Sequence, residues 1–215
     1  MNLFIATCVK LGIIGIGIAV GAARNKSLTD ANRMFWLFLL VAFAGEVLEF
    51  MMGRIFVNNY VYHHVFRPLY YAFLTLALAN EMGRLRKPFL ITIPVVAILA
   101  FLNAMYLQPP DKTFNTLIIV LTCLLLILQV LFYIAQLFDH HNWQETAYQY
   151  SLWIALGILI HSISSFLTLG IYNVMKQDGH RMTVPFLVIS EWLFYGSFVL
   201  NFWLQHKSPT TTKRL

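Results

Sequence analysis

The amino-acid sequence predicts an all-α polytopic membrane protein, a bundle of seven transmembrane helices with its N-terminus outside and its C-terminus in the cytoplasm. The first reason is composition: 59% of the 215 residues are hydrophobic and 11% are charged, whereas a soluble domain carries about 25% charged residues. The second reason is that seven apolar stretches reach the ~20 residues that a helix needs to cross a bilayer. The third reason is an excess of basic residues on one side of these stretches.

The seven predicted spans leave room for a single domain, residues 1–206, followed by a short cytoplasmic tail, residues 207–215. The predicted spans are residues 3–23, 34–53, 61–82, 88–106, 114–138, 148–172 and 184–205. The third span is the least regular, because the apolar residues that follow Pro68 are too few to cross a bilayer, so we expect its helix to begin near Tyr60. Pro94 is expected to kink the fourth span.

Basic residues are distributed unequally between the two sides that seven spans define. Nine lie on the side of the C-terminus: Arg24, Lys26, Arg33, Arg84, Arg86, Lys87, Lys207, Lys213 and Arg214. Five lie on the side of the N-terminus: Arg54, Arg67, Lys112, Lys176 and Arg181. Because cytoplasmic loops carry the excess of Lys and Arg, the C-terminus is predicted to be cytoplasmic. The net charge of +6 therefore indicates orientation and not binding to nucleic acid.

The second predicted span carries two carboxylates, Glu46 and Glu49, within an apolar run. Residues three apart share a helix face, and a charge at the bilayer centre costs about 2.5–3.5 kcal/mol on insertion scales, so both carboxylates need a partner, a proton or water. At a rise of about 1.5 Å per residue, Lys10, His161 and Glu191 from three other spans reach the same level in the outer half of the bilayer. Five ionisable groups on four helices therefore predict one polar cluster.

Small and polar residues extend the helix faces that carry these groups, so we expect the faces to enclose a polar pocket. The candidate pocket residues are Lys10, Glu46, Glu49, Tyr71, His161, Ser165, Glu191 and Tyr195. The mouth of the pocket is expected under the outer loops, at His63, His64 and Arg67. The alternative is that Lys10 pairs with a glutamate and that the cluster only holds the helices together.

An ionisable group inside the membrane indicates a function by default, and three functions fit the predicted pocket. The favoured one is non-enzymatic: a sensor or accessory subunit that binds a small ligand, a lipid or a partner protein. The second is a proton-coupled transporter or proton relay, because chains of carboxylates and histidines carry protons across membranes. The third is an intramembrane enzyme in which His161 and a glutamate form an acid–base pair or bind a metal.

No catalytic residue and no cofactor are predicted, and the case for a metal rests on residue types alone. The metal-ligand candidates are Glu46, Glu49, His161 and Glu191. The sequence has no HExxH motif and no regular histidine spacing. Cys8 and Cys123 lie in apolar runs and are expected to be small buried residues, not a disulfide. The expected partners are the lipid bilayer and, through helix contacts, another membrane protein; no nucleic acid is expected.

Seven helices with an outside N-terminus resemble the rhodopsin-type arrangement, but the seventh span holds no lysine for a retinal Schiff base, so retinal is not expected. The sequence also resembles small bacterial seven-helix membrane proteins and sensor modules, some of which precede histidine kinases. The similar features are Asn58 to Tyr60 before the third span and Ser151 to Gly157 at the start of the sixth. This resemblance implies a multi-pass protein of the bacterial inner membrane with a sensor role. Since the chain ends shortly after the last span, we expect any output to pass through helix contacts with a partner.

Overall fold

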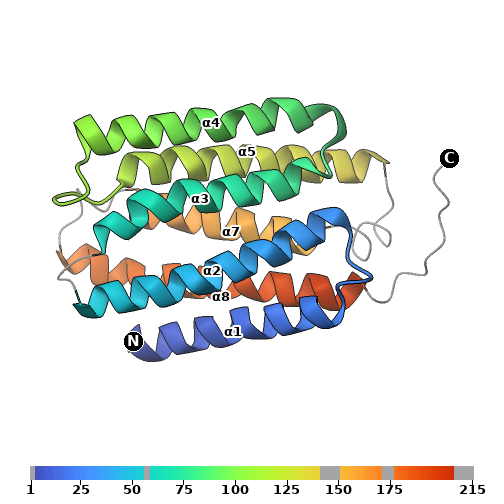
Figure 1. Ribbon diagram of the computed structural model, residues 1–215, viewed down its shortest axis with the longest axis horizontal. Helices are drawn as coiled ribbons and strands as arrows, with labels where there is room; N and C mark the ends of the chain where they lie inside the picture. The colour runs from blue at the N-terminus through green and yellow to red at the C-terminus, as the bar shows by residue number, and fades with distance from the viewer. Residues whose placement is uncertain (1–2, 56–58, 141–150, 171–176, 206–215) are drawn as a thin grey trace.

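The computed structural model describes residues 3–55, 59–140, 151–170 and 177–205, and within these ranges the chain is helical and contains no strand. Seven α-helices are present there: α1 (Leu3–Ala23), α2 (Asp30–Ile55), α3 (Tyr60–Ala79), α4 (Arg86–Leu102), α5 (Thr116–His140), α7 (Leu152–Leu169) and α8 (Gln177–Leu204). Two short segments flank α4, a 3₁₀ turn at Gly83–Leu85 and a π turn at Asn103–Leu107. The helices lie side by side and alternate in direction, so that α1 begins at one end of the bundle and α8 finishes at the other (Figure 1).

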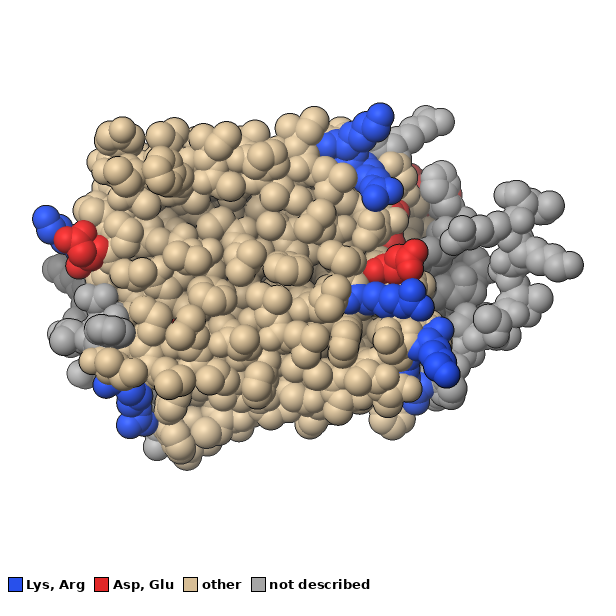
Figure 2. Space-filling model, in the orientation of Figure 1, with Lys and Arg blue, Asp and Glu red and all other residues tan. Residues whose placement is uncertain are grey.

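Six of the seven helices in the described ranges are long and apolar enough to cross a membrane, and α3 is the one that is not among them. The chain is therefore a multi-pass membrane protein. Figure 2 shows that Lys, Arg, Asp and Glu gather at the two ends of the molecule, and that on this face the belt between the ends carries none of them. Large apolar side chains, among them Ile91 and Phe101, are exposed on the surface, as expected where lipid replaces water.

The helices form a closed ring with one helix outside it. In the ring α1 contacts α2, and the contacts continue through α3, α5, α7 and α8 back to α1. α4 packs outside the ring against α3 and α5. Toward the end where α2 begins, the centre of the ring is filled by aromatic side chains: Phe35, Phe38, Phe194, Phe198 and Phe202 are all buried. The other half of the ring is where the polar residues meet.

The observed helices differ from the predicted spans mainly because they include polar residues that the apolar stretches leave out. α2 begins at Asp30 instead of residue 34, because the Thr29 hydroxyl accepts the Asn32 backbone N–H at 3.2 Å and so caps a polar first turn. Pro68 lies in the interior of α3, which does begin at Tyr60. Residues 148–150 and 171–172 of the predicted sixth span lie outside the described residues.

The two cysteines are in different environments, which corrects the expectation that both are buried. Cys123 is buried, whereas Cys8 is exposed, and both are free thiols. Cys8 is next to the exposed Val9 on α1. Hydropathy cannot separate a lipid-facing position from a core position, because both are apolar.

Candidate functional site

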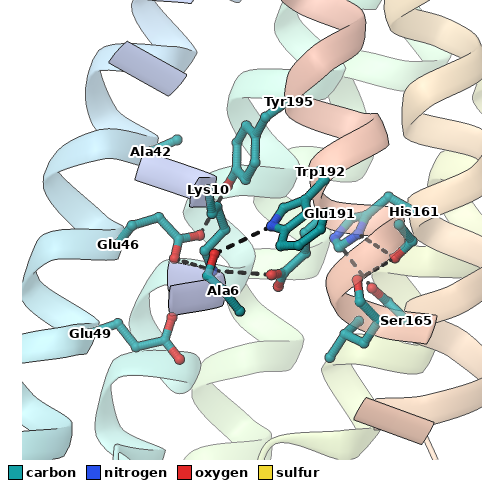
Figure 3. A network of polar contacts seen from close by, with 12 residues as sticks. Ala6, Lys10, Ala42, Glu46, Glu49, His161, Ser165, Glu191, Trp192 and Tyr195 are labelled. Atoms are coloured by element: carbon teal, nitrogen blue, oxygen red, sulfur yellow. Dashed lines mark hydrogen bonds and ion pairs between the residues drawn. The ribbon is translucent and has the colours of Figure 1, made fainter. Parts of the chain in front are cut away.

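The Lys10 ammonium lies between two carboxylates that come from different helices. Its Nζ contacts Glu46 Oε2 on α2 and lies 3.2 Å from Glu191 Oε2 on α8 (Figure 3). Lys10 and Glu46 are both buried, with 8% and 6% of their surface exposed. Since an isolated charge at this depth is costly, the three groups compensate one another and join α1, α2 and α8.

Neighbouring residues of α8 hold this contact in place. Trp192 donates its indole N–H to the Ala6 carbonyl at 3.3 Å, which fixes α1 against α8 one turn before Lys10. The Tyr195 hydroxyl donates to Glu46 Oε1 at 3.0 Å. Glu191 and Tyr195 are four residues apart and therefore share a helix face. Both oxygens of Glu46 are thus engaged, one by Lys10 and the other by Tyr195 (Figure 3).

Glu49 interacts with the start of α3. Its Oε1 accepts the Asn59 side-chain amide at 2.9 Å and lies 3.4 Å from His63 Nε2. Asn59 and His63 lie close to Glu49 because α3 begins only a short connection after the end of α2. Neither Lys10 nor Arg67 forms an ion pair with Glu49 in the described residues.

The Arg67 side chain on α3 contacts the neighbouring helix α5. Its Nε donates to Thr122 Oγ1 at 3.0 Å, and its Nη2 lies 2.7 Å from Cys123 Sγ. Within the described part of the chain, its guanidinium forms no ion pair. His64, the third residue expected at the pocket mouth, points elsewhere, because its Nε2 lies 3.2 Å from the Thr113 carbonyl between α4 and α5.

His161 on α7 is held by hydroxyl groups and by an aromatic ring. Its Nδ1 lies 3.4 Å from Ser190 Oγ, and its Nε2 lies 3.3 Å from Ser165 Oγ. The ring stacks on Phe194 with centroids 5.0 Å apart and an interplanar angle of 15°. Its ring nitrogens therefore contact serines, and the pairing with a glutamate that an acid–base mechanism would need is not formed in the described residues.

These side chains surround an internal cavity of about 80 Å³ between α2, α3, α5, α7 and α8. Its ionisable and hydroxyl-bearing lining residues are Glu46, Glu49, Tyr62, His63, Arg67, Tyr70, Tyr71, His161, Ser162, Glu191 and Tyr195. A single water needs about 10–15 Å³ of such space, so the cavity has room for several waters or for a small ligand. Lys10, Ser165 and His64, all predicted site residues, do not line it.

Tyr62, which was not predicted as a pocket residue, joins Tyr70 and Tyr71 in the polar wall, and the Gln129 amide contacts this wall through Tyr71. The Tyr62 and Tyr70 hydroxyls lie 3.1 Å apart, and Tyr71 accepts the Gln129 side-chain amide at 2.9 Å. Gln129 in turn accepts the Thr75 hydroxyl at 3.1 Å. The available signal was that Gln129 is polar inside the apolar fifth span, where an unpaired amide would be costly.

Another carboxylate, the half-buried Glu81, lies at the opposite end of the bundle, in the turn after α3. Glu81 accepts hydrogen bonds from the Tyr133 hydroxyl and from Ser151 Oγ, the latter at 2.9 Å. Loss of hydration on burial raises the pKa of the Glu81 carboxyl, and the hydrogen bonds from Tyr133 and Ser151 offset part of this rise. Glu81 falls near the end of the predicted third span, residues 61–82, and its partners Tyr133 and Ser151 belong to distant segments.

The metal-ligand candidates are not gathered into one site. In the described ranges, no group of three or more His, Cys, Asp or Glu side chains is placed to hold a metal ion. Comparison of the chain with protein-family models, with curated proteins and with solved structures finds no match.

Proposed function

We propose that all seven helices cross the bilayer, with the N-terminus outside and the C-terminus in the cytoplasm. The alternating helix directions and the charged ends of the molecule support this arrangement (Figures 1 and 2). α3 has 20 residues and lies between α2 and α5 in the ring, which supports its crossing together with them. Four of the residues in the basic-charge argument, Lys176, Lys207, Lys213 and Arg214, lie outside the described residues. The resemblance to small bacterial seven-helix proteins supports a bacterial inner membrane.

In this orientation the internal cavity lies in the outer half of the membrane, and the protein is a sensor or accessory subunit that binds a small polar ligand there. The observation that carries the proposal is the Arg67 guanidinium, which lines the cavity and forms no ion pair in the described part of the chain. Carboxylates of Glu46, Glu49 and Glu191 line the same cavity. A small ligand with an anionic group toward Arg67 and hydrogen-bond donors toward the glutamates is complementary to this wall.

The position of the cavity allows a bound ligand to change how the surrounding helices are arranged. Its walls come from five helices, and the Lys10 cluster on its edge ties α1 to both α2 and α8. A ligand that binds one arrangement of these helices better than another shifts their equilibrium by its differential affinity. A partner protein in contact with the outer faces of the helices would receive that shift.

The test is to identify small molecules that purify with the protein. Wild type, Arg67→Gln and Arg33→Gln are purified in parallel, and the molecules released on denaturation are identified by mass spectrometry. Arg33 is the matched control, because it is an exposed arginine in the first turn of α2. It pairs only with Asp30 in the described residues. A molecule retained by wild type and Arg33→Gln but lost from Arg67→Gln supports the proposal. Equal retention of every such molecule by all three proteins contradicts the proposal.

A proton relay is the second candidate, because one set of hydrogen bonds leads from the cavity into the opposite half of the bundle. Tyr71 lines the cavity, and its bonds continue through Gln129 to Thr75. Gln129 lies one turn before Tyr133 on α5, and Tyr133 contacts Glu81. The discriminating measurement is proton entry into liposomes under a potassium–valinomycin potential. A relay requires entry that Gln129→Leu slows; a rate equal to that of protein-free liposomes excludes it.

A further inference from the structure

α1 and α2 are tightly packed at one end and separate at the other. At the tight end Trp36 donates its indole N–H to the Ile18 carbonyl at 3.0 Å. There, a Cβ on Gly17 would lie 2.8 Å from Leu39 Cδ1, so the Leu39 side chain of α2 packs directly on the glycine. At the other end a Cβ on Gly53 would meet nothing within 4 Å. The Lys10–Glu46 ion pair lies between these two regions.

The separation opens a cleft of about 400 Å³ between the start of α1 and the end of α2. The lining residues are Phe4, Thr7, Lys10, Glu46, Glu49, Phe50, Gly53, Arg54 and Asn59. Only Glu46 and Glu49 also line the internal cavity, so these two carboxylates form the partition between cleft and cavity. The cleft is therefore a separate site on the outside of the helix ring.

The cleft carries charge of both signs at different depths. Arg54 lies in the last turn of α2, with its guanidinium 5.1 Å from the Phe50 ring centroid and 5.9 Å from that of Phe4. In the described residues Arg54 forms no ion pair with a carboxylate. Glu49 lies five residues earlier on the same helix, about 7–8 Å deeper along the axis. The site thus offers a cation near the membrane surface and a carboxylate below it.

We propose that this cleft binds the headgroup of an amine-bearing phospholipid, phosphatidylethanolamine, from the outer leaflet. The phosphate binds Arg54 at the level of the membrane surface, and the primary ammonium enters the cleft toward Glu49. The acyl chains lie along the exposed apolar side chains of the same two helices, which include Ile5 and Met51. A phospholipid is the appropriate source, because the cleft lies between two helices that face the bilayer and is bordered by aromatic rings.

The primary ammonium of the headgroup determines selectivity. The primary ammonium donates hydrogen bonds to a carboxylate, and charge-assisted bonds of this kind are the stronger ones. A quaternary ammonium has no N–H to donate, and phosphatidylglycerol has no amine at all. The proposal rests on the outer-half placement in the proposed function but not on occupancy of the internal cavity.

Native mass spectrometry of the full chain in detergent, titrated with defined lipids, tests the proposal. Phosphatidylethanolamine is expected to bind on the order of tenfold more tightly than phosphatidylglycerol or phosphatidylcholine, as loss of one charge-assisted contact implies. Glu49→Gln should remove this preference, because it removes the charged acceptor of the ammonium, and Arg54→Gln should weaken binding of all three lipids. The substitution Arg33→Gln at the other end of α2 is the control and should leave both affinity and preference unchanged. Soluble phosphoethanolamine at equal concentration should not compete, because it lacks the acyl chains.

The experiments distinguish failure of the lipid proposal from failure of the proposed ligand binding in the internal cavity. Equal affinity for the three lipids, or a preference that survives Glu49→Gln, overturns the headgroup site, and competition by phosphoethanolamine assigns the site to a soluble ligand instead. Arg67→Gln changes the cavity alone, so it should not alter lipid preference. Lipid selectivity that depends on Glu49, together with no small molecule dependent on Arg67, would keep the lipid site and remove the cavity function.

Discussion

Lys10 on α1 and Glu46 on α2 form an ion pair in which both residues are buried, and Glu191 Oε2 on α8 lies 3.2 Å from the same ammonium. Removing one member of a buried pair leaves the other charge uncompensated and typically costs about 3–5 kcal/mol. Lys10→Met is therefore expected to destabilise the protein by about this amount. Glu46→Gln is expected to cost less, because Lys10 keeps Glu191 as a partner.

The double substitution Lys10→Met with Glu46→Gln should recover part of the loss caused by Lys10→Met alone. The measurement is thermal unfolding in detergent for wild type, both single variants and the double variant. Coupling between contacting residues typically lies between about 0.5 and 3 kcal/mol. Simple additivity would contradict the pair and would indicate that Lys10 extends to the membrane surface.

The contact between α7 and α8 depends on the absence of a side chain at Gly157. A Cβ there would lie 2.8 Å from Ser197 Cβ and 3.4 Å from the Phe194 Cα, so one of the two helices would have to move. Gly157→Ala is expected to lower stability by about 1–3 kcal/mol, the usual cost of overpacking. Gly196→Ala on α8 is the control, since its Cβ meets nothing within 4 Å and alanine favours a helix by about 1 kcal/mol. Equal unfolding temperatures for the two variants would contradict the close approach.

Glu81 gives the stability a specific dependence on pH. Because burial raises its pKa in the folded state, the folded protein binds the proton more readily than the unfolded chain does. The stabilisation that Glu81 contributes is complete below the ordinary glutamate pKa. It is lost as the pH rises from there through the raised pKa of the folded state. Glu81→Gln should therefore gain stability relative to wild type as the pH increases. Thermal unfolding of both proteins from about pH 4 to pH 8 checks this; a difference that stays constant across the range would refute it.

The membrane orientation is tested independently of the site. A reporter fused after Leu215 in a bacterial host is expected to be cytoplasmic, because the predicted loops carry nine basic residues on that side and five on the other. A second reporter, inserted between Lys112 and Thr113 in the turn before α5, should lie outside. Opposite results for the two reporters would invert the orientation and place both cavity and cleft in the cytoplasmic half.

Much of the polar cluster could be predicted because span limits set the level of every residue along the membrane normal. Lys10, Glu46 and Glu191 meet as their levels implied. The partners of Arg67 could not be predicted in this way, since its level is equally compatible with Glu49 and with α5. The rotation of α3 and the length of the arginine side chain decide in favour of Thr122 and Cys123.

The sequence by itself determined the all-helical class, the apolar stretches that cross the membrane and the set of ionisable groups that need partners, because hydrophobic length and helical rise are local properties. The tertiary structure decided which helices are neighbours, where α1 separates from α2, and how Glu46 and Glu49 come to divide a cleft from a cavity. These features depend on the rotation and tilt of each helix, which are set by packing between segments far apart in the chain. A periodic apolar sequence is compatible with many such packings, and contacts such as that of Gly17 with Leu39 select one of them.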